Sequence, residues 1–306
     1  MLRLNWKRLT LVAFVGWMCL FTATTGQAAE PLRWKFAVGD DLEFHVVQNM
    51  RLDMESASGA LISNVRQEFD MTWHVAGVND AGDAVIVGRF DRIQTSMDNA
   101  DEEKFSYDSA NDEVPAGLAA MVSPMYEAMT AGEYEITMSA RGEVRDVRVP
   151  EEVAAWIKKG PGADAVGEDA GIEAFKSMIT QGIVPLPEET PSVGQTWSTS
   201  TAVHVPNCES ATVETTYRYE GTKDSDGTTY AVIRPTLKMD LVGNDKLQTR
   251  VKEQLTSGEI LFDPSAGRAH SIELEHRASI EVTVAGQTLQ GMIDQRIDVA
   301  VAPNSD

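Results

Sequence analysis

The sequence predicts a mainly β protein, a β-rich α+β fold of antiparallel strands, from three observations. Residues 65–75 alternate between apolar and polar side chains with a period of two, the pattern of a strand with one dry and one wet face. The turn-forming run 79–83 leads into a second β-rich segment at 84–93, so the two segments form a hairpin. The same order of strand, acidic glycine-containing turn and strand recurs at 213–233, which predicts an internal duplication.

The N-terminal 29 residues are typical of a secretory signal peptide. Three basic residues precede an apolar run at 11–21, and small residues follow as far as Ala29. The apolar run is shorter than the roughly 20 residues that span a bilayer, which disfavours a retained anchor. We therefore expect cleavage after Ala28 or Ala29, no transmembrane segment afterwards, and an exported protein that is periplasmic or extracellular.

The charge of the chain limits its partners. The sequence has 26 Lys and Arg against 47 Asp and Glu, and loss of the three basic signal residues leaves 23 against 47, a net charge of −24 (23 − 47). Such an acidic surface repels phosphate backbones and anionic membrane surfaces. No nucleic acid partner is expected, whereas a basic protein partner or loosely held divalent cations remain compatible with the charge.

The rest of the chain is expected to form two β-units with helices between them. We expect a first β-unit at 30–160 that ends in helices, a helix and Pro/Gly linker at 161–192, and a second β-unit at 193–306. The predicted strands are 32–36, 42–54, 65–75, 84–93, 134–138, 144–149, 193–197, 213–220, 230–233, 258–262, 272–284 and 289–299, and the predicted helices are 115–129, 150–159 and 171–181.

Strands this long, with one apolar and one charged face, belong to antiparallel sheets that are wet on one side. The dry side needs a cover. We therefore expect duplicated antiparallel sheets, curved or half-barrel-like, with the helices between the halves covering the apolar face. A closed barrel is the alternative. Pro124 is expected to kink or split the helix at 115–129.

A stripe of methionines marks the candidate binding site. Three methionines recur every four residues on the predicted helix at 115–129, so they share one face. Methionine is flexible and suits irregular apolar contacts, so the stripe predicts either an ordinary core or a cavity that holds an acyl chain or a hydrophobic partner segment. The candidate ligand-binding residues are those of the stripe and of the facing strand: Met121, Met125, Met129, Phe69, Met71 and Trp73.

No catalytic or metal site is predicted. The chain lacks Gly-x-Ser-x-Gly and His-Glu-x-x-His, and Cys208 stands alone once Cys19 leaves with the signal, so it is either inert or pairs with another chain. The run 224–227 resembles part of a calcium loop, but Ile233 stands where such a loop needs a bidentate Glu. A hairpin turn explains this run better. We expect no cofactor, and an enzyme is the least favoured class.

The histidines divide between the two faces of the predicted strands. His270 and His276 fall on the apolar face of one strand, about 20 Å apart, too far to share a metal ion. They are expected to be interior histidines, with pocket-lining roles as the alternative. His45 and His74 fall on polar faces and are expected to be solvated.

Three segments carry a family resemblance: 32–40 near the mature start, 194–197 and 258–264. Through them the chain resembles an exported bacterial family catalogued as a domain of unknown function. The resemblance implies export and a β-rich fold, and it brings no catalytic residues.

The sequence thus favours an exported non-enzymatic binding protein that holds an apolar ligand, a small molecule or lipid, or a protein partner against a β-sheet. The alternative is a structural or interaction protein of the cell envelope without a ligand pocket.

Overall fold

The computed structural model describes residues 30–56, 59–99, 105–111, 118–160, 167–202, 208–243, 247–284 and 287–303. The expected signal peptide, 1–29, lies outside the described residues. Pro31–Asp306 forms one compact unit. The expected internal boundaries at 160 and 193, and the expected relatedness of the two β-units, stay predictions.

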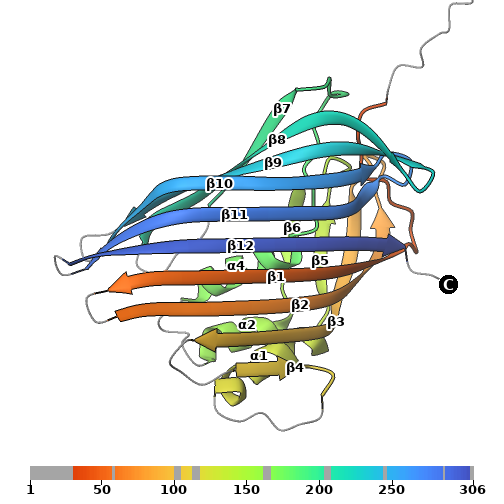
Figure 1. Ribbon diagram of the computed structural model, residues 1–306. Coiled ribbons are helices and arrows are strands. Elements are labelled where there is room, and N and C mark those ends of the chain that lie inside the picture. Colours follow the sequence, from red (N-terminus) through yellow and green to blue (C-terminus); the bar gives the residue numbers. More distant parts are fainter. Residues whose placement is uncertain are drawn as a thin grey trace, which may run out of the picture. The chain divides into compact units, whose positions relative to one another are not determined.

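The chain forms its strands and helices in an order close to the expected one (Figure 1). The strands are β1 (Asp41–Ser56), β2 (Gly59–Val78), β3 (Ala84–Asn99), β4 (Phe105–Asp108), β5 (Tyr134–Met138), β6 (Val144–Arg148), β7 (Thr196–Ala202), β8 (Cys208–Ser225), β9 (Thr228–Gly243), β10 (Leu247–Asp263), β11 (Arg268–Val284) and β12 (Gln287–Pro303). The helices are α1 (Leu118–Ala131), α2 (Glu151–Lys159) and α4 (Glu168–Ile179).

The described strands form one 12-stranded antiparallel sheet in the order β6-β5-β3-β2-β1-β12-β11-β10-β9-β8-β7, with β4 paired to β3. The predicted mainly β, antiparallel class is confirmed. The strands of the two halves share this single sheet because β1 pairs with β12 from Leu42↔Pro303 to Glu55↔Gln290. The sheet is open, with β6 and β7 at its two ends.

The register gives each face of the sheet its composition. Phe44 pairs with Met71 on β2 and with Val301 on β12, and directly paired residues project from the same face. We call the face that carries Phe44 the inner face and the opposite face the outer face. Among the described side chains of β1, β2, β10, β11 and β12, no Asp, Glu, Lys or Arg projects from the inner face. The predicted separation of charged side chains from the apolar face therefore holds on these strands.

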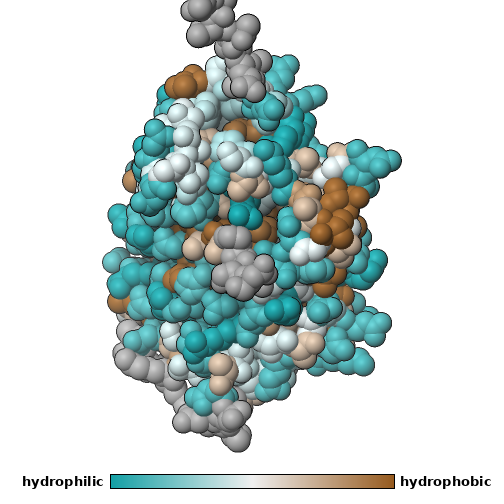
Figure 2. Space-filling view, turned by 90° about the vertical axis from the view of Figure 1, so that its right-hand side faces the viewer, coloured by the Kyte–Doolittle hydropathy of each residue, from teal (hydrophilic) through white to brown (hydrophobic). Residues whose placement is uncertain are grey.

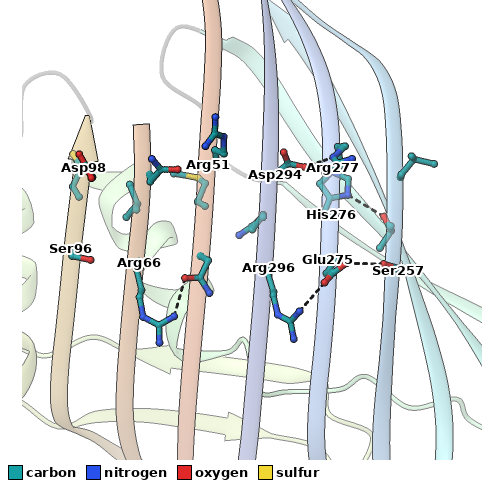
Figure 3. A pocket seen from close by; sticks show the side chains of 18 of the residues that line it. Arg51, Arg66, Ser96, Asp98, Ser257, Glu275, His276, Arg277, Asp294 and Arg296 are labelled. Carbon is teal, nitrogen blue, oxygen red and sulfur yellow. Dashed lines mark hydrogen bonds and ion pairs between the residues drawn. The ribbon is translucent and has the colours of Figure 1, made fainter. Parts of the chain in front are cut away.

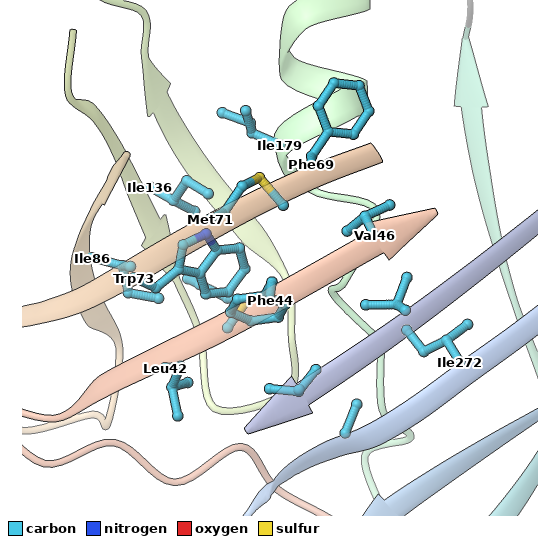
Figure 4. Close-up of a cluster of buried hydrophobic side chains, with 14 of the residues drawn as sticks. Leu42, Phe44, Val46, Phe69, Met71, Trp73, Ile86, Ile136, Ile179 and Ile272 are labelled. Carbon is cyan, nitrogen blue, oxygen red and sulfur yellow. The ribbon is translucent and has the colours of Figure 1, made fainter. Parts of the chain in front are cut away.

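The core lies between one end of the inner face and the helices (Figures 1 and 4). The Trp73 indole N–H donates to the Tyr134 hydroxyl at 2.9 Å, so this buried pair is satisfied. Burial raises the pKa of the Tyr134 phenol. Gly88 makes room for the ring, since a Cβ there would lie 2.1 Å from Tyr134. Phe175 of α4 packs edge-on against Phe90 of β3, which fixes the helix layer to the sheet.

The helices follow their local sequence signals. α2 has Glu151 and Glu152 in its first turn and Lys158 and Lys159 in its last, as the helix dipole favours. α1 continues through Pro124 as one helix, so of the two expected effects of this proline the split does not occur, and the kink stays a prediction. The expected start of this helix at 115 lies outside the described residues.

The segment 32–36 is not the regular strand that its alternation predicted. The Trp34 N–H donates to Ala140 O in the β5–β6 turn, and the Lys35 N–H donates to Gly267 O in the β10–β11 turn. Consecutive N–H groups thus bond to two different turns, so the segment crosses hairpin ends instead of adding to a sheet edge.

The turn at 224–227 is a tight hairpin, as expected. Ser225 pairs with Thr228, so Asp226 and Gly227 form a two-residue loop. Both have positive φ, 50° and 80°, as a type I′ turn requires.

Candidate functional site

The inner face has two parts that differ in how they are covered. The covered half is the part that belongs to the contiguous core and includes Phe44, Phe69 and Trp73. The open half is the inner face of 50–54, 61–65, 278–282 and 289–293, none of which joins that core among the described residues.

The open half is apolar and partly solvent-accessible. Leu61 is 55% exposed and Met50 38%. Leu52, Met54, Val65, Val282, Leu289 and Ile293 are half-buried. Gly291 lets Met54 and Ile280 meet above β12, since a Cβ there would lie 2.3 Å from the Met54 sulfur. Ile280 is only 8% exposed, and no helix in the described ranges joins this apolar surface to the core.

Four of the six predicted site residues are buried in the core, three of them on the covered half and one, Met129, on α1. Phe69, Met71, Trp73 and Met129 are at most 3% exposed and belong to the core. Met125 is half-buried and packs against this core. The side chain of Met121 lies outside the part of the chain that the structure describes. The structure thus places the five described residues in or against one packed core, and ligand binding by the predicted set stays a prediction that requires α1 to move.

A row of side chains that starts at Met50 and continues with three polar residues borders the open half. Met50 pairs with Gln295, which pairs with His276, and His276 pairs with Thr256 on β10, so these four side chains form one line across the inner face. The His276 side chain is only 4% exposed. Its Nδ1 lies 3.1 Å from the Thr256 hydroxyl, while its buried Nε2 has no hydrogen-bond partner among the described residues. Burial lowers the pKa of the imidazole, which favours the neutral form.

His270 does not share the inner face with His276, contrary to the sequence prediction. Leu261 pairs with Ser271 and the next residue, Phe262, pairs with Ala269, so the register skips His270 at a bulge. The bulge turns His270 outward, where its ring stacks on Tyr230 at 4.8 Å.

His45 and His74 lie on the outer face, as predicted. Both are exposed, and each imidazole lies 2.7 Å from a carboxylate, Asp70 and Asp41 respectively.

β9 and β10 are joined by an unusual seam. Their backbone pairing covers only 231–233 and 260–262. Beyond it, the Thr256 hydroxyl bonds to both N–H and C=O of Leu237, and the Gln254 amide does the same for Met239. Proline has no backbone N–H group. Because Pro235 lies two residues before Leu237, the N–H group that it lacks would have pointed toward β10. Two side chains thus replace the backbone ladder where proline interrupts it.

The outer face carries a groove of about 1020 Å³ across the strands (Figure 3). Its lining residues come in runs of three from neighbouring strands, chiefly 49–51, 64–66, 96–98, 255–257, 275–277 and 294–296. The first and last residues of each run project outward. The middle residue of each run projects inward. The next inner-face residues along the strand, such as Leu52 two positions after Met50, do not line the groove. The groove therefore lies between two outer rows of side chains.

The groove is an ion-pair ladder. Arg296 donates to Glu275 at 2.9 Å and also pairs with Asp298, and Arg277 pairs with Asp294. These carboxylates raise the pKa of both guanidinium groups. Because each arginine of the described lining has an acidic partner, these arginines offer no unpaired cation to an anion. No group of three or more His, Cys, Asp or Glu is placed to hold a metal ion within the described ranges.

The end of the molecule where β1 begins has a mostly hydrophilic surface with scattered apolar groups (Figure 2). None of the helices in the described ranges is both long and apolar enough to cross a membrane.

Sequence reasoning missed the open half and its polar border. A signal was present: Gln48, Gln67 and Gln295 interrupt the apolar positions of three adjacent strands. Together with His276 they mark where the dry face changes character.

The fold is similar to that of a solved structure described as lipid–protein interactions in lipovitellin. The TM-score is 0.51 and the identity 10%, over 88% of this chain and 25% of that chain, so this chain spans about a quarter of lipovitellin. Weaker likenesses, with TM-scores of 0.25 and 0.18, are to an outer membrane channel from Pseudomonas putida F1 and to a putative outer membrane lipoprotein-sorting protein domain from Vibrio parahaemolyticus. Each is 7% identical, covering 88% of this chain and 97% of the channel, and 89% of this chain and 88% of the sorting domain. These two scores carry no conclusion.

No curated protein matches the chain. A model described as a family of unknown function, DUF6263, matches residues 81–252, which is more than half of the chain.

Proposed function

The chain belongs to DUF6263, a family of unknown function, and we propose from the geometry of its sheet that it is an exported, non-enzymatic protein that binds an apolar ligand on the open half of the inner face. The ligand class is a lipid or another apolar small molecule. Export rests on the signal-like segment 1–29.

One observation carries this proposal: a long, uncharged apolar surface stays partly accessible on a protein whose outer face is densely charged. Monomeric proteins rarely leave such continuous patches unless they bind something. Met50 and Leu61, 38% and 55% exposed, have strand neighbours that hold them in a fixed sheet, so the surface is formed before any ligand arrives.

A further fact supports the proposal. The fold is similar to that of part of lipovitellin, whose solved structure concerns its interactions with lipid.

A second candidate, an envelope interaction protein, is favoured by β7. This end strand, Thr196–Ala202, contains no charged residue and no proline, and it pairs only with β8 among the described strands. Natural sheets protect such edges with charges, so an unprotected edge favours strand addition by a partner protein.

Binding of diphenylhexatriene, a pure hydrocarbon that fluoresces in apolar surroundings, tests the proposal. We expect the purified protein to bind it, and Ile293→Glu to abolish binding by placing a charge on the open half. Met292→Glu is the matched control, because the neighbouring Met292 is 41% exposed and projects from the outer face.

Absence of probe binding, or an equal loss of probe binding in both variants, would reject the apolar-ligand function. The envelope interaction protein would then be the favoured function. Native mass spectrometry of protein purified from its own host would then show whether a partner chain is retained.

A further inference from the structure

Building on the proposed function, we propose that the ligand of the open half is an uncharged lipid, an acyl chain with a neutral hydroxyl group, and that this hydroxyl donates a hydrogen bond to His276. The inference assigns a ligand class and an orientation to the surface.

The first argument is the charge of the inner face. On the five central strands no described inner-face side chain is Asp, Glu, Lys or Arg. A carboxylate or phosphate head group placed on this face would lose its hydration without gaining a counter-charge, which is strongly unfavourable. A neutral head group has no such cost, provided that it finds a hydrogen-bond partner.

The second argument is that such a partner exists. His276 lies at the border of the open half, 4% exposed, with Nδ1 held by the Thr256 hydroxyl at 3.1 Å. This bond fixes the ring, so Nε2, the ring nitrogen away from the main chain, points off the inner face without a partner among the described residues. Buried polar atoms are nearly always satisfied, so an unpartnered one beside an apolar surface points to a ligand.

The open half also has the length and direction that an acyl chain needs. From His276 to Val282 the strand rises about 20 Å along the open half. Ala278 and Ile280 lie between them on the same face, and Ile293 pairs with Ala278 on β12. An extended acyl chain can therefore lie along these strands, with its polar end at His276 and its methyl end near Val282 at the far ends of the strands.

Displacement of diphenylhexatriene by two ligands of equal chain length tests the inference. At pH 8 we expect 1-dodecanol to displace the probe at a concentration at least about tenfold lower than dodecanoate does, because the anion has no counter-charge on this face. His276→Phe should weaken dodecanol binding about three- to tenfold, the worth of one hydrogen bond, and leave the affinity for the hydrocarbon probe unchanged.

His270→Phe is the matched control, since this exposed histidine of the same strand lies outside the open half, and it should change neither affinity. If His276→Phe does not fold, His276→Leu replaces it with the same expectation. Equal displacement by dodecanol and dodecanoate, or an unchanged dodecanol affinity in the His276 variant, overturns the inference while probe binding keeps the proposed function. Failure of the probe to bind overturns both.

Discussion

The two halves of the inner face are made by the same strands with the same alternation, yet they pack differently. The covered half carries aromatic side chains, Phe44, Phe69, Trp73 and Phe90, whose rings contact one another and the helix layer. The open half carries no aromatic residue at its described positions, and aliphatic residues, methionine, serine and glycine stand there instead. Aromatic rings are therefore found where helices dock, and mainly aliphatic side chains where no described helix covers the sheet.

The difference shows that a sheet face can be apolar without being buried. Alternation alone makes both halves apolar, and the half that carries the aromatic rings is the half that belongs to the core.

The first experiment is to compare truncations in the two halves. Phe69→Ala should lower the free energy of unfolding by about 3–5 kcal/mol, the usual cost of deleting a buried ring. Leu52→Ala, at a half-buried position, should cost roughly 1 kcal/mol or less. Urea denaturation of both variants measures the contrast, and equal losses would mean that the open half is also core.

Charges placed on α1 distinguish a fixed cover from a movable lid. Met129→Asp should destabilise the protein by several kcal/mol, because Met129 is 3% exposed within the core. Met125→Asp tests whether α1 is a fixed cover or a movable lid, because Met125 is half-buried at the core surface. A fixed cover unfolds with this charge. A lid over a ligand site at the predicted methionine stripe keeps the fold and loses uptake of a fluorescent fatty acid.

The seam beside the open half should be weaker than the rest of the sheet. Gln254→Met removes both hydrogen bonds to the Met239 main chain and leaves those groups unpaired, at a cost of about 1–3 kcal/mol. Hydrogen exchange should then accelerate in β7, β8 and β9, with β1 and β2 unchanged. Uniform acceleration across all strands would show that the seam does not separate them.

The smallest expected effect is the pH response of His276. Its folded pKa is lowered by burial, so the unfolded chain binds the proton more readily. The stability that comes from keeping this imidazole neutral is complete above its ordinary pKa of 6.5 and is lost as the pH falls from there toward the lowered value. The thermal midpoint of wild type should fall between pH 7 and pH 5 by more than that of His276→Gln. Parallel curves would contradict a buried neutral histidine.

The sequence predicted the strand faces well because alternation is a local property. Phe44 and Asp70, for example, lie on the faces that their positions in the strands indicate. The same rule failed at His270, because one bulge residue inverts the parity of the residues beyond it and no local signal marks the bulge.

The candidate site was predicted less well, for a physical reason. Met71 and Met129 do belong to one core, as the apolar periodicity indicates, but the sequence does not specify how far the helices extend over the sheet. The open half depends on that extent. His276 was assigned to the inner face, while its bond to Thr256 required knowing the pairing of β10 with β11.

The pairing of β1 with β12 also bears on when the chain can fold. These two strands are neighbours in the middle of the sheet, although one is the first strand and the other the last. Until β12 is available, β1 is an unpaired apolar edge, and contacts so distant in sequence form slowly. The native sheet therefore closes only after β12 has been made.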